Sequence, residues 1–288
     1  MDLIHFILNA AAMLLWLSWR SHRFVPANDF RGGTLLSTLK KTERGQFNRK
    51  TLVTSLVTLL GLRAIFYWHI GTGVNWAPRM DFVVISIPYR CDFFDRMLLF
   101  SVLSFGCWLG IFAFAMLFLQ LLNHRTGETN PWQAIVKKHL GIVSDLPIGV
   151  RIFLPALTAF VLWLVLSYYL SYLLILELPG SWQHWVGQAL VLAVTVHLLC
   201  TPLILAVMLL HMVNSYVYLG NYAFLAYINT TAQTLLKLIR RLPLRLGKID
   251  LAPLVFSAIV LGLDIILRRG LGEEHRYSLL WFFQHFMI

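Results

Sequence analysis

Six apolar stretches, each long enough to cross a lipid bilayer, dominate the sequence and limit the folds that it can adopt. A helix needs about 20 predominantly apolar residues, at about 1.5 Å each, to cross the hydrocarbon core. Hydrophobic residues make up 58% of the chain, charged residues 13%, and the mean hydropathy is +0.71, which excludes a soluble globular protein. We therefore predict an all-α, polytopic bundle of transmembrane helices. The six expected spans are residues 3–19, 51–70, 97–123, 152–176, 188–213 and 251–267.

A basic phrase that recurs between pairs of these spans indicates internal repetition. Residues 34–41 read TLLSTLKK, residues 234–241 read TLLKLIRR, and residues 130–138 carry a weaker copy, NPWQAIVKK. Such repetition predicts three helical hairpins, each with a basic connector between its two spans. The expected hairpin units are residues 1–96, 97–186 and 187–288.

The basic residues predict the orientation of the chain in the membrane. Of the 24 Lys and Arg residues, 17 lie in the segments after the first, third and fifth spans. Because positive charge accumulates in cytoplasmic loops, both termini are expected outside and all three connectors in the cytoplasm. The expected location is a bacterial inner membrane. The net charge of +11 follows this topology, so we expect the positive charge to face anionic lipid and not nucleic acid.

The connectors have the pattern of amphipathic helices that lie in the membrane interface with their cations at headgroup level. The alternative is an ordinary cytoplasmic turn with positive-inside charge. Membrane lipids are therefore expected partners. The candidate headgroup contacts are Lys40, Lys41, Lys137, Lys138, Lys237, Arg240 and Arg241.

Two further apolar segments lie on the predicted outer side and are too short to span. They are the loop over residues 71–94 and the aromatic tail over residues 277–288, which reads YSLLWFFQHFMI. We expect both to pack on the bundle or in the outer interface, where a partner protein has access to them.

Two charged residues fall inside predicted spans at similar depths. Arg63 lies in the second span and Asp264 in the sixth, and matching residue 34 to residue 234 places Arg63 beside Asp264. Ions inside a bilayer cost several kcal/mol when unpaired, so we predict an ion pair between the two residues. The alternative is that Arg63 extends to the interface while Asp264 lies among hydrated headgroups.

The sequence carries no pattern typical of an active site. It has no G-x-S-x-G, H-E-x-x-H or P-loop motif, and we expect no catalytic residue, no metal site and no cofactor. His197 and His211 are 14 residues apart, about 21 Å along a helix, so they cannot ligate one metal together. One of them as a haem ligand is the alternative to a hydrogen-bonded core histidine.

The segment from residue 235 to residue 255 reads LLKLIRRLPLRLGKIDLAPLV and resembles the signature of the YggT family of small membrane proteins. The resemblance covers about 65 residues of the third unit, 205–269. A structural interpretation accounts for the motif as a device for re-entering the membrane, in which Asp250 caps the next helix and Pro253 occupies its first turn. The matching residues are Arg240, Arg241, Pro243, Gly247, Ile249, Asp250 and Pro253.

The resemblance implies a family whose members are associated with osmotic tolerance, cell division and cytochrome assembly. We therefore expect a non-enzymatic scaffold or accessory subunit of a membrane complex, with other membrane proteins or copies of itself as partners. The alternative is a channel or transporter, because repeated units and intramembrane ions are also typical of transporters.

Overall fold

The protein, described from a computed structural model, is built almost entirely from α-helices, with two small hairpins of β-strand. The structure describes residues 2–21, 48–74, 76–124, 130–177, 180–217, 222–239, 245–246, 249–270 and 278–285. The first connector, residues 34–41, lies outside these ranges, as do Lys40, Lys41, Arg240, Arg241, Pro243 and Gly247. The chain forms two compact units, 1–80 with 88–110 and 81–87 with 111–288.

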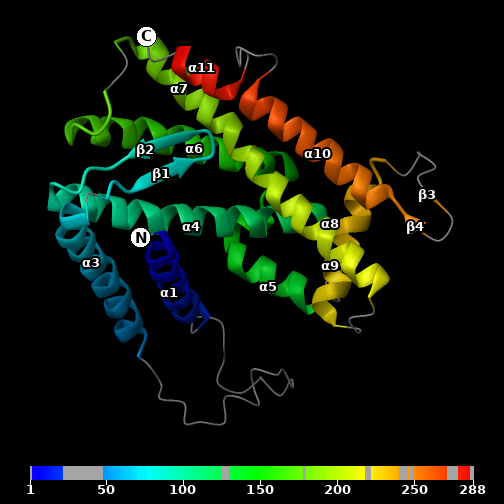
Figure 1. The fold of residues 1–288 in the computed structure, drawn as a ribbon. Coiled ribbons are helices and arrows are strands. Elements are labelled where there is room, and N and C mark those ends of the chain that lie inside the picture. The colour runs from blue at the N-terminus through cyan, green and yellow to red at the C-terminus, as the bar shows by residue number, and fades with distance from the viewer. Residues whose placement is uncertain are drawn as a thin grey trace. The chain divides into compact units, whose positions relative to one another are not determined.

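Unit one contains two long helices and the first part of a third (Figure 1). Helix α1 comprises Asp2–Ser21, α3 comprises Arg49–Val74, and α4 comprises Phe94–Leu122. Residues up to Gly110 of α4 belong to unit one, and the remainder belongs to unit two. The division of the chain into three hairpins stays a prediction.

Unit two contains the other helices and most of the small sheet structure. Its helices are α5 (Pro131–Leu140), α6 (Ile148–Tyr172), α7 (Trp182–Thr195), α8 (Cys200–Tyr216), α9 (Ala223–Leu236), α10 (Ala252–Arg269) and α11 (Leu279–His285), with 3₁₀ turns η1 (Gly141–Asp145) and η2 (Val196–Leu199). The strands β1 (Arg79–Phe82) and β2 (Ile85–Pro88) form one hairpin, and β3 (Arg245–Leu246) pairs antiparallel with β4 (Ile249–Asp250).

Five segments are long and apolar enough to cross a membrane, so the chain has the properties of a membrane protein. They are Asp2–Ser21, Arg49–Val74, Phe94–Leu122, Ile148–Tyr172 and Trp182–Tyr216. They coincide with the first five expected spans. The sixth expected span is α10, which is helical as predicted but includes Asp264, Arg268 and Arg269 among its 18 residues. These charges leave its crossing of the membrane a prediction.

The fifth segment, Trp182–Tyr216, is interrupted near its middle. Helix α7 ends at Thr195, the 3₁₀ turn η2 follows, and α8 resumes the helix at Cys200. Opposite this interruption, α6 contains Pro155, whose missing N–H leaves the Arg151 carbonyl without its helical partner. His197 of η2 hydrogen-bonds to the neighbouring Ile152 carbonyl at 3.2 Å. The two irregular segments are therefore joined directly.

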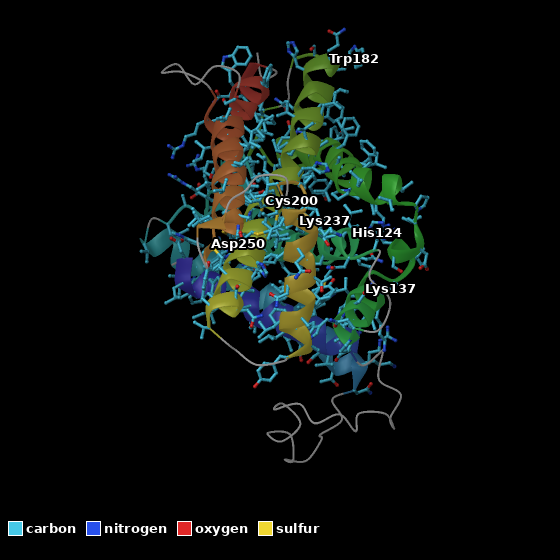
Figure 2. The ribbon with its side chains drawn as sticks, turned by 90° about the vertical axis from the view of Figure 1, so that its right-hand side faces the viewer. His124, Lys137, Trp182, Cys200, Lys237 and Asp250 are labelled. Carbon is cyan, nitrogen blue, oxygen red and sulfur yellow. The ribbon has the colours of Figure 1, made fainter. Side chains whose placement is uncertain are left out.

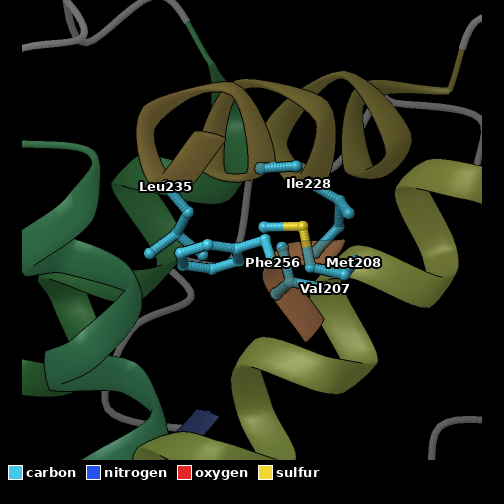
Figure 3. Packing of buried hydrophobic residues seen from close by; sticks show 6 residues of the cluster. Val207, Met208, Ile228, Leu235 and Phe256 are labelled. Atoms are coloured by element: carbon cyan, nitrogen blue, oxygen red, sulfur yellow. The ribbon is translucent and has the colours of Figure 1, made fainter. Parts of the chain in front are cut away.

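The apolar core of unit two lies where α8, α9 and α10 meet. Met208 and Ala232 are fully buried there, and Figure 3 shows Phe256 of α10 beside Leu235 and Met208. Leu235, from the third connector phrase, belongs to this cluster, and Leu236 and Ile239 pack against it. Three apolar residues of this connector thus pack at the protein core, although an interfacial position was expected for them, whereas Leu238 is 75% exposed. The buried members are Val207, Met208, Ile228, Ala232, Leu235 and Phe256.

The predicted outer loop packs against the helices of unit one. Tyr89 is fully buried, with its ring 5.4 Å from that of Phe100, and the Cys91 thiol donates a hydrogen bond to the Trp76 carbonyl at 3.0 Å. Burial raises the pKa of Tyr89 and of Cys91 above their usual values. Gly71 is required for this contact, because a Cβ there would lie 2.5 Å from the Cys91 sulfur. The loop is therefore anchored by close packing.

The aromatic tail contains the short helix α11, which contacts α7 and α10 within unit two (Figure 1). Phe283 is 2% exposed and its ring lies 5.7 Å from that of Trp163 on α6. Phe82 of β1 approaches the same indole at 6.1 Å. The described part of the tail therefore docks on the helices, which is one of the two positions expected for it.

Candidate functional site

The strongest candidate for a functional site is a buried polar network in unit one, organised around Arg63. This residue lies in the middle of α3 and is 2% exposed. Its Nη1 donates to Asn9 Oδ1 at 2.5 Å, its Nε donates to Ser101 Oγ at 3.0 Å, and its Nη2 donates to the Ser101 carbonyl. Arg63 thus joins α3 to both α1 and α4 through neutral acceptors.

The network continues from Asn9 to Ser104 of α4 and to His5 on the same face of α1. Asn9 is fully buried, and its Nδ2 donates to Ser104 Oγ at 2.9 Å and to His5 Nε2 at 3.0 Å. Because the amide nitrogen can only donate, His5 Nε2 accepts, and the imidazole is neutral with its proton on Nδ1. His5 Nδ1 then donates to the Tyr67 hydroxyl at 2.9 Å. Arg63 is therefore the charged member of this network.

Helical spacing explains why these residues meet. His5 and Asn9 are four residues apart on α1, Arg63 and Tyr67 are four apart on α3, and Ser101 lies three residues before Ser104 on α4, so each pair shares one helix face. Serine side chains are small and allow helices to approach closely in a membrane. Ser101 Oγ also donates to the Leu60 carbonyl at 2.8 Å, which fixes its lone pairs toward Arg63. Because of this spacing, α1, α3 and α4 each present one polar face to the other two helices.

The structure gives Arg63 and Asp264 polar partners within their own units. Asp264 Oδ2 accepts from Arg268 Nε at 2.8 Å, and its Oδ1 accepts from Thr201 Oγ1 at 3.1 Å. Arg268 Nη1 donates in turn to the Val83 carbonyl at 2.8 Å. These contacts tie α10 to α8 and to the β1–β2 turn. The ion pair between Arg63 and Asp264 stays a prediction.

The second and third connectors contact each other through α5 and α9. The Trp132 and Phe224 rings lie 5.1 Å apart, and Asn130 Nδ2 donates to the Ala223 carbonyl at 3.3 Å. At the end of α4, Asn123 Nδ2 donates to Thr231 Oγ1 at 2.7 Å. Asn130 caps α5 by accepting from the Trp132 amide, with Pro131 in the first turn.

The basic residues of these connectors differ in exposure. Lys138 and Lys237 are exposed, whereas Lys137 is half-buried. Figure 2 shows Lys137 at the opposite end of unit two from Trp182. In the same view Lys237 lies at an intermediate height, near that of Cys200, so the two connectors differ in their distance from the start of α7.

The described residues of the family-like motif form the start of α10. Asp250 Oδ1 accepts a hydrogen bond from the Ala252 amide at 3.0 Å, and Pro253 lies buried in the first turn. Ile249 is paired with Leu246 in the β3–β4 hairpin. The N-cap position of α10 is Leu251, whose side chain makes no cap hydrogen bond, so Asp250 bonds to the first helical amide from the residue before the cap. Pro253 in the first turn agrees with the structural interpretation of the motif.

The two histidines of the fifth segment both have protein partners. His197 bonds to the Ile152 carbonyl, and His211 Nδ1 lies 2.9 Å from Asn229 Oδ1. Among the described residues, no group of three or more His, Cys, Asp or Glu side chains is arranged to hold a metal ion. Both histidines are half-buried and hydrogen-bonded within the protein.

Sequence reasoning identified Arg63 but missed the other members of its network, His5, Asn9, Ser101 and Ser104. The available signal was that Asn9 and the two serines are polar residues near the middle or outer half of predicted spans, at depths comparable to that of Arg63. It also missed Arg151 of α6, which is 8% exposed. Comparison with known proteins found no matching family model, no matching curated protein and no matching solved structure.

Proposed function

We propose that the protein is a non-enzymatic scaffold or accessory subunit of a complex in a bacterial inner membrane. The observation that carries this proposal is the hydrogen-bonded network of unit one, which links polar residues of three candidate spans. Arg63 donates to both Asn9 and Ser101 and so joins three helices. A transport site needs polar groups that exchange between the protein and a passing substrate. Polar groups that already hydrogen-bond to one another are suited to fixing the positions of the helices.

The exposed faces of the spans support a role in binding other membrane proteins. Helix α6 leaves Val165, Tyr168, Tyr169 and Tyr172 exposed, at 57% or more. Lipid tails can cover the aliphatic part of this face, while tyrosine hydroxyls are suited to the membrane interface or to a partner. The proposed partners are membrane proteins, which include copies of this chain.

The proposal includes six spans, both termini outside, and basic connectors in contact with anionic lipid. The exposed cations Lys138 and Lys237 support lipid contact by the second and third connectors. Membership of the YggT family is part of the same proposal. It is supported by the hydrogen bond from the Ala252 amide to Asp250 and by Pro253 in the first turn of α10.

The test is site-specific photocrosslinking in native membranes. A photoreactive residue at Tyr169, which is 57% exposed, is expected to capture a discrete membrane protein. The same residue at the adjacent Leu170, which is fully buried, is the matched control and should capture none. Capture of lipid alone at Tyr169, together with a monomer in mild detergent, would contradict the scaffold proposal.

A channel or transporter is the second candidate, because the fifth segment is interrupted by η2 opposite Pro155 of α6. Discontinuous helices of this kind form substrate sites in transporters. Ion flux in vesicles reconstituted with the full chain, abolished by Arg63→Ala or Asp264→Ala, would favour this function. Vesicles containing the Thr58→Val variant, exposed on α3, provide the control.

A further inference from the structure

We propose that the amino-terminal end of α6 binds a phosphate-bearing anion, the headgroup of an anionic phospholipid, between Arg151 and the first amides of the helix. This site lies wholly within unit two. It is separate from the basic connectors, and it does not depend on the scaffold function.

Arg151 is the first of two observations that lead to this site. The residue is 8% exposed, and its Nε is buried with no hydrogen-bond partner among the described residues. Its backbone amide donates to the Pro147 carbonyl at 3.1 Å, but the structure gives its guanidinium no hydrogen bond or ion pair within the described ranges. A guanidinium that is buried at this level requires hydrogen-bond acceptors, either an anion or a set of neutral oxygens.

The nearest acidic residue in the sequence does not supply that anion. Asp145, in η1, accepts a hydrogen bond from the Ser144 hydroxyl at 3.0 Å and forms no ion pair with Arg151. Arg63, the other buried arginine, differs because each of its three guanidinium nitrogens donates to a neutral oxygen. The guanidinium N–H donors of Arg151 therefore remain available to a ligand.

The amino terminus of α6 is the second observation. Its cap residue is Pro147, which provides no side-chain hydrogen bond, so the amides of Ile148, Gly149 and Val150 are uncapped. These three residues are exposed, and a Cβ added at Gly149 would meet no atom within 4 Å. Uncapped amides at the positive end of a helix dipole bind phosphate groups. The open space at Gly149 gives an anion access to them.

The direction of helical side chains brings the two groups together. A side chain on an α-helix leans toward the amino terminus, so Arg151, the fourth helical residue, extends back toward the first turn. A guanidinium binds two phosphate oxygens at once, and the amides can take a third. Arg151 lies in the first turn of the candidate span Ile148–Tyr172, at the end of the span, close to where lipid phosphates lie. A phospholipid headgroup therefore matches both the charge and the position.

The experiment measures binding of dioleoylphosphatidylglycerol to the detergent-purified full chain by native mass spectrometry. Arg151→Gln is expected to weaken the tightest-bound lipid about tenfold, because it removes charge-assisted hydrogen bonds. Lys50→Gln removes an exposed cation at the start of α3 and should change binding less than about twofold. Arg151→Lys should recover only part of the affinity, since an ammonium lacks the planar fork.

A second variant keeps the test independent of the buried arginine. Gly149→Leu fills the open space over the amides while Arg151 remains, and it should weaken lipid binding about threefold or more without lowering the unfolding temperature. Equal losses in Arg151→Gln and Lys50→Gln would overturn the site, as would unchanged binding in Gly149→Leu. The final measurement compares stabilisation of the protein by inorganic phosphate with stabilisation by the lipid. If phosphate stabilises the wild type as much as the lipid does, the lipid headgroup is not the ligand.

Discussion

Arg63 shows how one charged residue can be accommodated inside a helical membrane unit without a carboxylate. An uncompensated cation in a bilayer costs several kcal/mol, and here the amide oxygen of Asn9 and two oxygens of Ser101 offset that cost. The sequence identified Arg63 because a charge in an apolar run is conspicuous. It could not identify Asn9, 54 residues away, because a neutral side chain in a span carries no pairing information.

The first prediction concerns the coupling between Arg63 and Asn9. Asn9→Leu leaves a buried donor of Arg63 unpaired and should lower the free energy of unfolding by about 1–3 kcal/mol. Arg63→Met in that background removes the orphaned charge, so the double variant should be less destabilised than the sum of the singles. Thermal unfolding of all four proteins in detergent measures this coupling. Additivity within about 0.5 kcal/mol would contradict the proposed network.

Helices α5 and α9 show which parts of an element can be predicted from its sequence. The basic pair and the Asn130–Pro131 start marked α5 correctly as a helical connector, because cap chemistry is local. The β1–β2 hairpin was not predicted, since its turn contains Val83 at φ 47° and no glycine or asparagine. The burial of Leu235 was also missed, because the same apolar stripe suits a lipid interface and a protein core.

The second prediction separates two adjacent threonines of α9. Thr231 and Thr230 each donate to a carbonyl of their own helix at 2.8 and 2.9 Å, but Thr231 also accepts from Asn123 of unit two. Thr231→Val should destabilise the protein by about 1 kcal/mol, because Asn123 loses a buried partner. Thr230→Val, the matched control, should change stability by less than half as much. Equal unfolding temperatures of the two variants would count against the link between the end of α4 and α9.

At the scale of the whole chain, composition was enough to predict a helical membrane protein, and five candidate spans agree with the expected positions. Composition is less informative about the sixth expected span, α10, because this helix contains charged residues. Helix α10 has 18 residues, about 27 Å at 1.5 Å each, close to the hydrocarbon thickness of about 30 Å. Asp264 and Arg268 form an i,i+4 pair near its end. That pairing, which lowers the cost of their burial, is a local property of one helix that mean hydropathy does not record.

The third prediction is the topology that follows from α10. If it spans, residues at both ends of the chain face the same compartment, whereas five spans place them on opposite sides. Cysteine introduced at Asp2 and at Leu280, both at exposed positions, should react with a membrane-impermeant maleimide added from outside. Cysteine at Lys138 is the internal control and should react only after the membrane is opened. Labelling at Asp2 without labelling at Leu280 would contradict six spans.

The contact between Trp163 and Phe283 sets an order of events during biosynthesis. Phe283 is made 120 residues after Trp163, which at about 5–20 residues per second is a delay of roughly 6–24 seconds. During that interval α6 enters the membrane with its indole still uncovered on the side that α11 later occupies. A nascent chain therefore carries a temporary aromatic surface, and docking of α11 is a late step that marks completion of unit two.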